Sequence, residues 1–312
     1  MSTDSPLTER PAATRSAEKV QTLAPRRRSF GAWFADTGWR HLVAIVVSIF
    51  ALFPLLYVVS ASLNPKGTLT GSNQLFSAIG IDSYVRILSD PQNPYGTWFL
   101  NTLLIAVVTG AVTVFIGACA AYAFSRMRFA GRRVGLVTIV VVQMFPQLLA
   151  VVAIFLLMST LGDWFPAIGL NTHTGLILVY LGGALGVNTY LMYGFFNTIP
   201  KEIDEAARID GAGHARIFFT IILRLVAPIL AVVGLLSFIG TVNEYVIASV
   251  MLVDVDQQTL VVGLTKLVAN PRYADWSAFS AGAVMAAIPV MILFLFLQKY
   301  IVGGLTAGAT KG

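Results

Sequence analysis

Residues 202–213 read EIDEAARIDGAG and bring four carboxylates and one arginine together with a run of alanine and glycine. Such carboxylates could serve acid–base chemistry or hold a metal ion. His41, His173 and His214 have no ligand spacing to a cysteine or carboxylate, so we expect no metal site. The patterns G-x-x-x-x-G-K-[ST] and G-x-S-x-G are absent from the chain. The chain is therefore not expected to hydrolyse ATP or to cleave a bond itself.

The local pattern around this stretch predicts a short helix, a turn and a second helix. Thr198 is the expected N-cap and Pro200 lies in the first turn, so the acidic residues that follow lie where the helix dipole favours anions. The pairs Lys201–Glu205 and Asp204–Arg208 have i,i+4 spacing. Asp210-Gly211 is a turn signal, after which a second helix is expected near Gly213.

Two interpretations of this helix remain open. Charged helices are common in solvated loops, and the pattern of charges fits that interpretation. Small residues instead permit close approach by another backbone, which favours a docking surface. The small residues are Ala206, Ala207, Gly211, Ala212 and Gly213.

Composition places the stretch in an integral membrane protein. The 312 residues are 56% hydrophobic and 12% charged, with a mean hydropathy of +0.77. Soluble domains carry about 25% charged residues. Cys119 is the single cysteine, so no intrachain disulfide can form.

Six apolar runs follow a polar N-terminal segment, and each approaches or exceeds the ~20 residues that a helix needs to cross a bilayer. Backbone groups in lipid must be satisfied internally, so we expect helices. The runs are approximately 42–63, 99–124, 134–158, 174–196, 225–250 and 279–301. The predicted fold class is an all-α integral membrane protein with six transmembrane helices. Its predicted parts are a tail at 1–40, a permease domain at 41–303 and a second tail at 304–312.

The distribution of lysine and arginine predicts the orientation. Of the 21 basic residues, 17 lie in the two termini and in the second-to-third and fourth-to-fifth loops. The opposite loops hold Lys66, Arg86, Lys266 and Arg272. Because basic loops stay in the cytoplasm, both termini and residues 202–213 are expected there. The high pI is thereby explained by topology, and nucleic-acid binding loses its support.

The residues EAARIDGA, followed by a phenylalanine and an apolar stretch with a proline, resemble the EAA loop of ABC importer permeases. Further motifs over roughly residues 40–312 are similar to the MalG-type permease of maltose/maltodextrin importers. They are QMFP at 143–146, GLNTHTG at 169–175, APILAVVGLLSFI at 227–239, FSAGAVMAAIP at 279–289 and GLTAGATKG at 304–312. The family usually has Leu-Pro where this chain has Leu223-Arg224, so we expect its helix to run straighter into the fifth span.

The resemblance implies that the loop at about 198–218 is a coupling helix docking on a cytoplasmic ATPase subunit. The implied contact residues are Glu205, Ala206, Ala207, Asp210 and Gly211. It also implies that the C-terminal tail, with Gly304, Leu305, Thr306, Ala307 and Gly308, enters the interface between the two ATPase subunits. From its composition we expect this tail to be a flexible strand, and an ordinary frayed terminus is the alternative.

The external loop at 254–278 is implied to contact an extracytoplasmic sugar-binding protein, through Asp254, Gln257, Lys266, Asn270 and Arg272. The implied partners are a second homologous permease, an ATPase dimer, the binding protein and membrane lipid. No cofactor is expected on this chain, since ATP and magnesium belong to the ATPase subunits. The implied location is the bacterial inner membrane, and the implied substrate is maltose or maltodextrin, with trehalose or another glycoside as the alternative.

Polar residues within the apolar runs are candidates for the translocation pathway: Gln143, Gln147, Asn243 and Glu244. An intramembrane carboxylate is costly and by default functional, yet Glu244 could also lie near water at the outer end or at a helix break. The glutamines could instead be hydrogen-bonding contacts between helices. Asn188 and the glycines Gly182, Gly183 and Gly186 are interpreted as marks of close helix packing.

Two other classes of protein predict features that the sequence lacks. An ion-coupled secondary transporter predicts inverted repeats and paired intramembrane charges, and neither is visible. A membrane enzyme predicts a polar catalytic cluster within a span, for which Glu244 alone is too little. A co-purifying ATPase would separate the importer from both.

Overall fold

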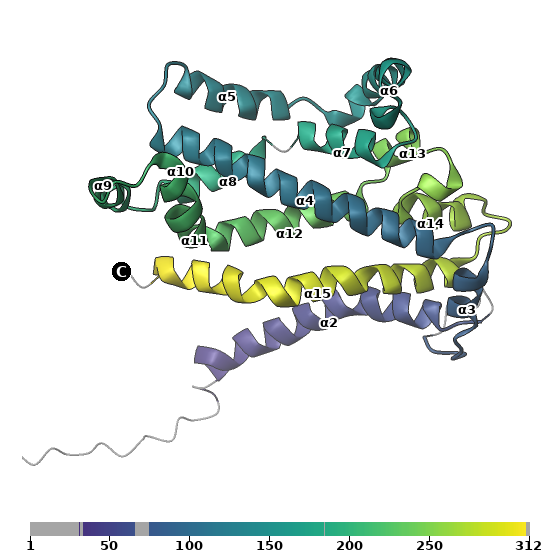
Figure 1. Cartoon of the computed structure of the whole chain (residues 1–312). Coiled ribbons are helices and arrows are strands. Elements are labelled where there is room, and N and C mark those ends of the chain that lie inside the picture. The colour runs from purple at the N-terminus through teal and green to yellow at the C-terminus, as the bar shows by residue number, and fades with distance from the viewer. Residues whose placement is uncertain (1–30, 32–33, 66–74, 184, 310–312) are drawn as a thin grey trace, which may run out of the picture. The chain divides into compact units, whose positions relative to one another are not determined.

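The computed structural model describes residues 31, 34–65, 75–183 and 185–309, without the side chains of Gln147 and residues 301–309. The described residues form helices joined by short connections (Figure 1). The helices are η1 (Phe34–Gly38), α2 (Trp39–Ser62), α3 (Asp82–Ser89), α4 (Tyr95–Arg126), α5 (Arg132–Gln143), α6 (Gln147–Trp164), η3 (Pro166–Ile168), α7 (His173–Gly182), α8 (Val187–Phe196), α9 (Glu202–Ile209), α10 (His214–Arg216), η4 (Ile217–Ile222), α11 (Leu223–Leu225), α12 (Ala227–Asn243), α13 (Val246–Met251), η5 (Val255–Gln257), α14 (Leu260–Ala269) and α15 (Trp276–Ala309).

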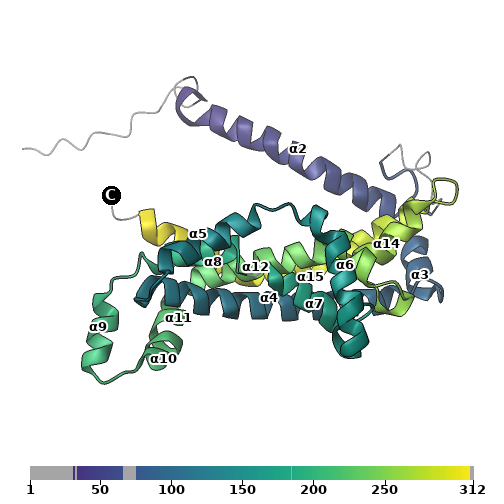
Figure 2. The ribbon, with the colours of Figure 1, turned by 90° about the horizontal axis from the view of Figure 1, so that it is seen from above.

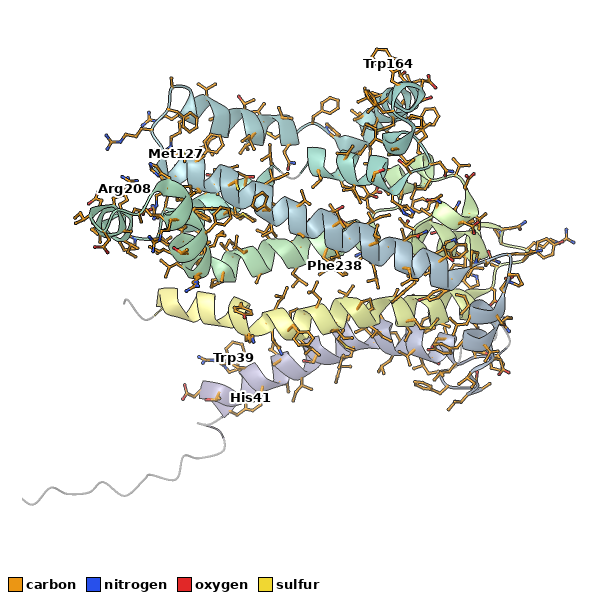
Figure 3. The ribbon with its side chains drawn as sticks, viewed as in Figure 1. Trp39, His41, Met127, Trp164, Arg208 and Phe238 are labelled. Atoms are coloured by element: carbon orange, nitrogen blue, oxygen red, sulfur yellow. The ribbon has the colours of Figure 1, made fainter. Side chains whose placement is uncertain are left out.

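The chain divides between Phe53 and Pro54, within α2, into two units. In the first unit, η1 and the start of α2 are helical from Phe34, inside the range predicted as an N-terminal tail. Figure 3 shows Trp39 and His41 at this beginning of α2. Apolar side chains of α2 such as Ile49 and Phe50 are exposed, as lipid-facing residues would be.

In the second unit, α4 is a continuous helix of 32 residues that packs against α7, α8 and α12. Its buried face is built largely from small residues, including Thr109, Thr113 and Ala118. Small side chains let neighbouring helices approach closely, which is how helices associate in lipid. Near its beginning the fully buried Trp98 donates a hydrogen bond from Nε1 to the carbonyl of Val255, at 2.7 Å. The helix α4 is therefore anchored at its first turn and packed along its length.

Three of the six predicted spans are broken. Three helices are long and apolar enough to cross a membrane, or up to six if each bent pair counts as one span. The bends are 98° between α5 and α6, 55° between α7 and α8, and 78° before α12. The third-span break lies at Pro146, which cannot donate to the ladder.

The other two breaks differ from the sequence-based expectations. Gly182, Gly183 and Gly186 surround a helix break, whereas the sequence suggested close packing within one helix. The 78° bend occurs although Arg224 replaces the usual proline, so the expected straighter helix is wrong. Pro228 explains the bend: it lies in the first turn of α12, and its ring would clash with the carbonyl of Arg224 in a continuous helix.

The elements of the second unit gather at two opposite ends. The helices α9, α10 and α11 lie at the same end as the C-terminal end of α15, while α3 and α14 lie at the other (Figures 1 and 2). In α15 the helix continues through Ala309, so residues 304–309 are helical rather than an extended strand. Once a helix is nucleated, propagation adds a hydrogen bond for each residue fixed, which offsets the helix-weakening effect of Gly303, Gly304 and Gly308. Residues 310–312 lie outside the described part.

Candidate functional site

The helix α9 presents one face to the protein and the other to solvent. Asp204 and Ala207 are buried, whereas Glu205 and Ala206 are exposed. Asp210 and Gly211 in the following turn are also exposed. Four of the five residues predicted to contact an ATPase therefore lie on an accessible surface, and Ala207 instead packs in the protein's own core.

The turn after α9 is set by Gly211, whose φ of +79° is left-handed. The amide of Gly211 donates to the carbonyl of Arg208, and the amide of Ala212 donates to that of Ala207, both at 2.9 Å. These two hydrogen bonds around a left-handed glycine form a Schellman motif. The predicted turn at Asp210-Gly211 is thus present, and α10 begins at His214.

The beginning of α9 differs from the expectation. The helix starts at Glu202, and its N-cap is Lys201. The hydroxyl of Thr198 donates to the carbonyl of Phe195, so Thr198 belongs to the end of α8. Asp204 pairs with Arg126 of α4 at 2.9 Å between Oδ2 and Nε, and not with Arg208, because its side chain faces the protein. Figure 3 shows Arg208 on α9 and Met127 at the end of α4.

A cavity of about 1140 Å³ is lined by residues at the breaks between α5 and α6, between α7 and α8 and between α12 and α13. Polar side chains from α4, α5, α7, α8 and α12 line it together with apolar ones. The polar lining includes Thr109, Thr113, Gln143, Tyr180, Asn188 and Glu244. Hydroxyl, amide and carboxylate groups on apolar walls suit a ligand with many hydroxyl groups and apolar faces.

Gln143 bridges the break between α7 and α8. Its Nε2 donates to the carbonyl of Gly183 at 2.9 Å, and its Oε1 accepts from the amide of Val187 at 3.2 Å. A Cβ atom at Gly186 would overlap this amide, so Gly186 makes the approach possible. Backbone groups that a broken helix leaves free must be satisfied away from water, and Gln143 does this from another span.

Glu244 holds the break between α12 and α13. Its Oε1 accepts from the amide of Ile247 at 2.8 Å, and its Oε2 accepts from the amide of Ala248 at 3.0 Å. The hydroxyl of Tyr180 in α7 donates to the same Oε2 at 2.6 Å. Glu244 therefore lies at a helix break and also lines the cavity.

The other two pathway candidates are placed differently. Asn243 is exposed, donates from Nδ2 to the carbonyl of Ile239 in its own helix and is outside the cavity lining. The side chain of Gln147 lies outside the described residues.

The predicted external loop is largely folded into η5 and α14. Leu260 and Val262 are buried, and the amide of Leu260 donates to the hydroxyl of Thr102 in α4. The side chains that remain exposed are Asp254, Lys266, Asn270 and Arg272, while Gln257 is half-buried. The predicted contact residues thus lie at the surface of a packed element.

Residues of the GLNTHTG motif at 169–175 connect the beginning of α7 with the segment that precedes η5. Asn171, in a left-handed conformation, donates its amide to the carbonyl of Met251 and accepts from the amides of Val253 and Asp254. It also donates from Nδ2 to the Asp254 carboxylate. Thr172 caps α7. The motif therefore holds the N-terminal end of α7 against the segment that enters η5.

Some features of the site escaped sequence analysis. Arg126 and Asp204 are 78 positions apart, and nothing local marks them as partners. Ile209 is 87% exposed at the end of α9. Its signal was present in the sequence, as a large apolar residue between Arg208 and Asp210. In the described part of the chain, no group of three histidine, cysteine or acidic residues could hold a metal ion.

The broken helices, the polar cavity among them and the helix α9 that protrudes at one end define a membrane transport subunit. The comparisons make the assignment specific. Residues 113–306 match the family described as binding-protein-dependent transport system inner membrane component. The chain belongs to this family of ABC importer permeases, whose members are transmembrane subunits rather than enzymes.

Proteins similar to this chain include sugar permeases. The maltodextrin transport system permease protein MdxG of Bacillus subtilis (strain 168) is 38% identical over 272 residues, covering 87% of this chain and 95% of the relative. The galactooligosaccharides permease GanQ of the same organism is 39% identical over 273 residues, with 87% and 94% covered. The maltose/maltodextrin permease MalG of Escherichia coli (strain K12) is 38% identical over 282 residues, with 87% and 95% covered.

A solved structure has the same fold. It is the crystal structure of a bacterial ABC transporter involved in the import of the acidic polysaccharide alginate. The TM-score is 0.70 at 29% sequence identity, and the match covers 88% of this chain and 98% of the other. The expected resemblance to MalG-type permeases is confirmed.

Proposed function

We propose that this chain is one of two transmembrane subunits of an ATP-driven importer that carries maltose or maltodextrin. The observation that supports it best is the cavity of about 1140 Å³ among broken helices in a chain of this family. Glucose units offer hydroxyl groups to threonine, tyrosine and amide side chains and apolar faces to the remaining walls. In this importer a second permease completes the pathway, and a binding protein delivers the sugar.

The ATPase subunits would bind ATP and magnesium and dock on the exposed face of α9. Glu205, Ala206, Asp210 and Gly211 form that face, and the exposed Ile209 supplies an apolar anchor for a cleft. Ala207 contributes by letting α9 pack closely against its own protein. The C-terminal end of α15, with residues 304–308, lies at the same end of the unit and forms a second contact with the ATPase dimer.

At the other end, Asp254, Gln257, Lys266, Asn270 and Arg272 would meet the binding protein. The exposure of four of these side chains and the partial exposure of Gln257, at the surface of a packed element, support this assignment. A galactooligosaccharide is the second candidate substrate, because GanQ is as similar to this chain as MdxG is. Trehalose and other glycosides are further alternatives.

The proposal is tested with the complete complex in proteoliposomes. We expect the chain to co-purify with an ATPase, and uptake of maltotriose to depend on ATP and on the cognate binding protein. Galactotriose serves as the matched competitor, since it has the same size and differs in hydroxyl stereochemistry and linkage. Uptake of galactotriose alone would transfer the assignment to the second candidate, and ATP-independent uptake would reject the importer.

Both termini are proposed to be cytoplasmic, because 17 of the 21 basic residues lie in the termini and in the second-to-third and fourth-to-fifth loops. Single cysteines at the exposed positions Ala130, Gly213 and Asn270, in a Cys119→Ser background, test this orientation. An impermeant thiol reagent on cells with a permeable outer layer but an intact inner membrane is expected to label Asn270→Cys alone. Disrupted cells, in which all three sites should react, provide the control. Labelling of Gly213→Cys in intact cells would reverse the orientation.

A further inference from the structure

Arg126 is the last residue of α4, and it binds the beginning of the α9 region through two contacts. Its Nε lies 2.9 Å from Oδ2 of Asp204 in α9. Its Nη2 donates to the carbonyl of Ile199, in the connection before α9, at 2.9 Å. The two side chains are only 2% and 3% exposed. The guanidinium group thus joins α4 both to α9 and to the segment that leads into it.

The pair lies inside an apolar cluster, which raises the cost of leaving either charge alone. Ala121, Tyr122, Ile199 and Ala207 are buried members of this cluster. The Asp204 carboxylate accepts no hydrogen bond from the described residues, so Arg126 is the charge that compensates it. Removing one partner of a buried ion pair is strongly destabilising, whereas replacing both by well-packed apolar residues is often neutral.

The covalent connection from α9 toward the cavity is less direct. It passes through the turn at Gly211, the short helices α10 and α11 and the 78° bend before α12. The helix α4, by contrast, is continuous from Arg126 back to Thr113 and Thr109, which line the cavity. Thirteen residues separate Arg126 from Thr113, or about 20 Å of straight helix. A displacement of α9 would therefore reach the cavity along α4 most directly through side chains that join the two helices.

We propose that the buried Arg126–Asp204 ion pair is the link that transmits movement of α9 to α4 and so to the cavity lining. The two residues are positioning residues for the transport cycle, and the inference rests on the proposed coupling function of α9. Movement of the ATPase would displace α9, the ion pair would carry α4 with it, and the cavity wall would follow. The apolar contacts around the pair hold α9 in place, and the guanidinium group adds the charge attraction to Asp204 and a hydrogen bond to the carbonyl of Ile199.

The test uses the complete transporter in lipid, with binding protein and maltotriose. The decisive variant is the double substitution Arg126→Met and Asp204→Leu, which removes both charges and leaves apolar side chains of similar length. We expect it to assemble with its partner subunits at the wild-type level. Its stimulation of ATP hydrolysis by sugar and binding protein is expected to fall about tenfold, which is within the range for coupling between distant sites. The ratio of sugar transported to ATP hydrolysed is expected to fall with it.

The single substitutions Arg126→Gln and Asp204→Asn are expected to assemble poorly, because each leaves a buried charge without its partner. If the ion pair only stabilises the fold, the double variant should recover both assembly and sugar-stimulated ATP hydrolysis. Wild-type stimulation in the assembled double variant would therefore overturn the proposal. So would a double variant that fails to assemble while both singles assemble and couple normally.

The Gly211→Asp variant separates the role of the ion pair from the proposed docking of the ATPase on α9. It alters the docking face and leaves the ion pair intact. If Gly211→Asp shows wild-type stimulation of ATP hydrolysis, the ATPase does not dock on α9. The Arg126–Asp204 pair then has no ATPase movement to transmit. If Gly211→Asp is uncoupled while the assembled double variant is fully coupled, docking stands and the link alone is wrong.

Discussion

The Gly211→Asp variant is expected to lose at least about tenfold in sugar-stimulated ATP hydrolysis, with assembly of the two permeases unchanged. A Cβ atom at Gly211 would meet nothing within 4 Å in this chain, so the substitution creates no clash within the protein. It adds a side chain and a charge to the exposed face of α9, where close approach by an ATPase is proposed. The measurement is hydrolysis by the reconstituted transporter with and without maltotriose and binding protein.

Conformational strain has to be separated from lost docking. Gly211 has a φ of +79°, and an ordinary residue in the left-handed region costs about 1–2 kcal/mol. Gly131 is a matched control, because its φ is +84°, it is exposed and a Cβ atom there would also meet nothing within 4 Å. Gly131→Asp introduces the same strain and charge in the loop between α4 and α5. We expect it to retain coupling; equal losses in both variants would point to strain and would contradict docking at Gly211.

The second large effect is expected at Glu244, where Glu244→Gln should lower the maximal rate of sugar uptake about tenfold. The carboxylate accepts two backbone amides of α13 and the hydroxyl of Tyr180. An amide group has one accepting oxygen, so at least one of these donors loses its acceptor. Hydrogen bonds to a charged group contribute about 1.5–3 kcal/mol each, which is enough to alter the break between α12 and α13. The measurement is uptake at saturating sugar, with the amount of complex determined in parallel.

The neighbouring Asn243 offers a matched control, since it is exposed and bonds only its own helix among the contacts described for it. Asn243→Ala is expected to transport normally. Tyr180→Phe removes one of the three hydrogen bonds and is expected to give a smaller loss in the same direction. Normal transport by Glu244→Gln and Glu244→Ala would mean that the carboxylate contributes nothing to the pathway.

The class of the protein and much of its organisation follow from the sequence alone. Apolar runs of about 20 residues require helices, because only helices satisfy their own backbone in lipid. The turn at Asp210-Gly211 was predictable because glycine reaches a positive φ without steric cost. The resemblance of EAARIDGA and the further motifs was enough to name the family, which the comparisons confirmed. These features are local: each depends on residues close together along the chain.

The breaks in the helices and the partners of the polar residues were decided by the tertiary structure. Pro146 indicated that the third predicted helix is perturbed. The direction of a bend, however, depends on which neighbouring groups bond the backbone that a break leaves free, as Gln143 does for Gly183. The pair Arg126–Asp204 joins residues that are adjacent only after folding, so the i,i+4 rule wrongly assigned Asp204 to Arg208. The residues after Gly303 were expected to be extended from their composition, yet the preceding helix continues through them. Composition and spacing thus determine which segments enter the membrane, whereas packing determines where the helices break and which charges meet.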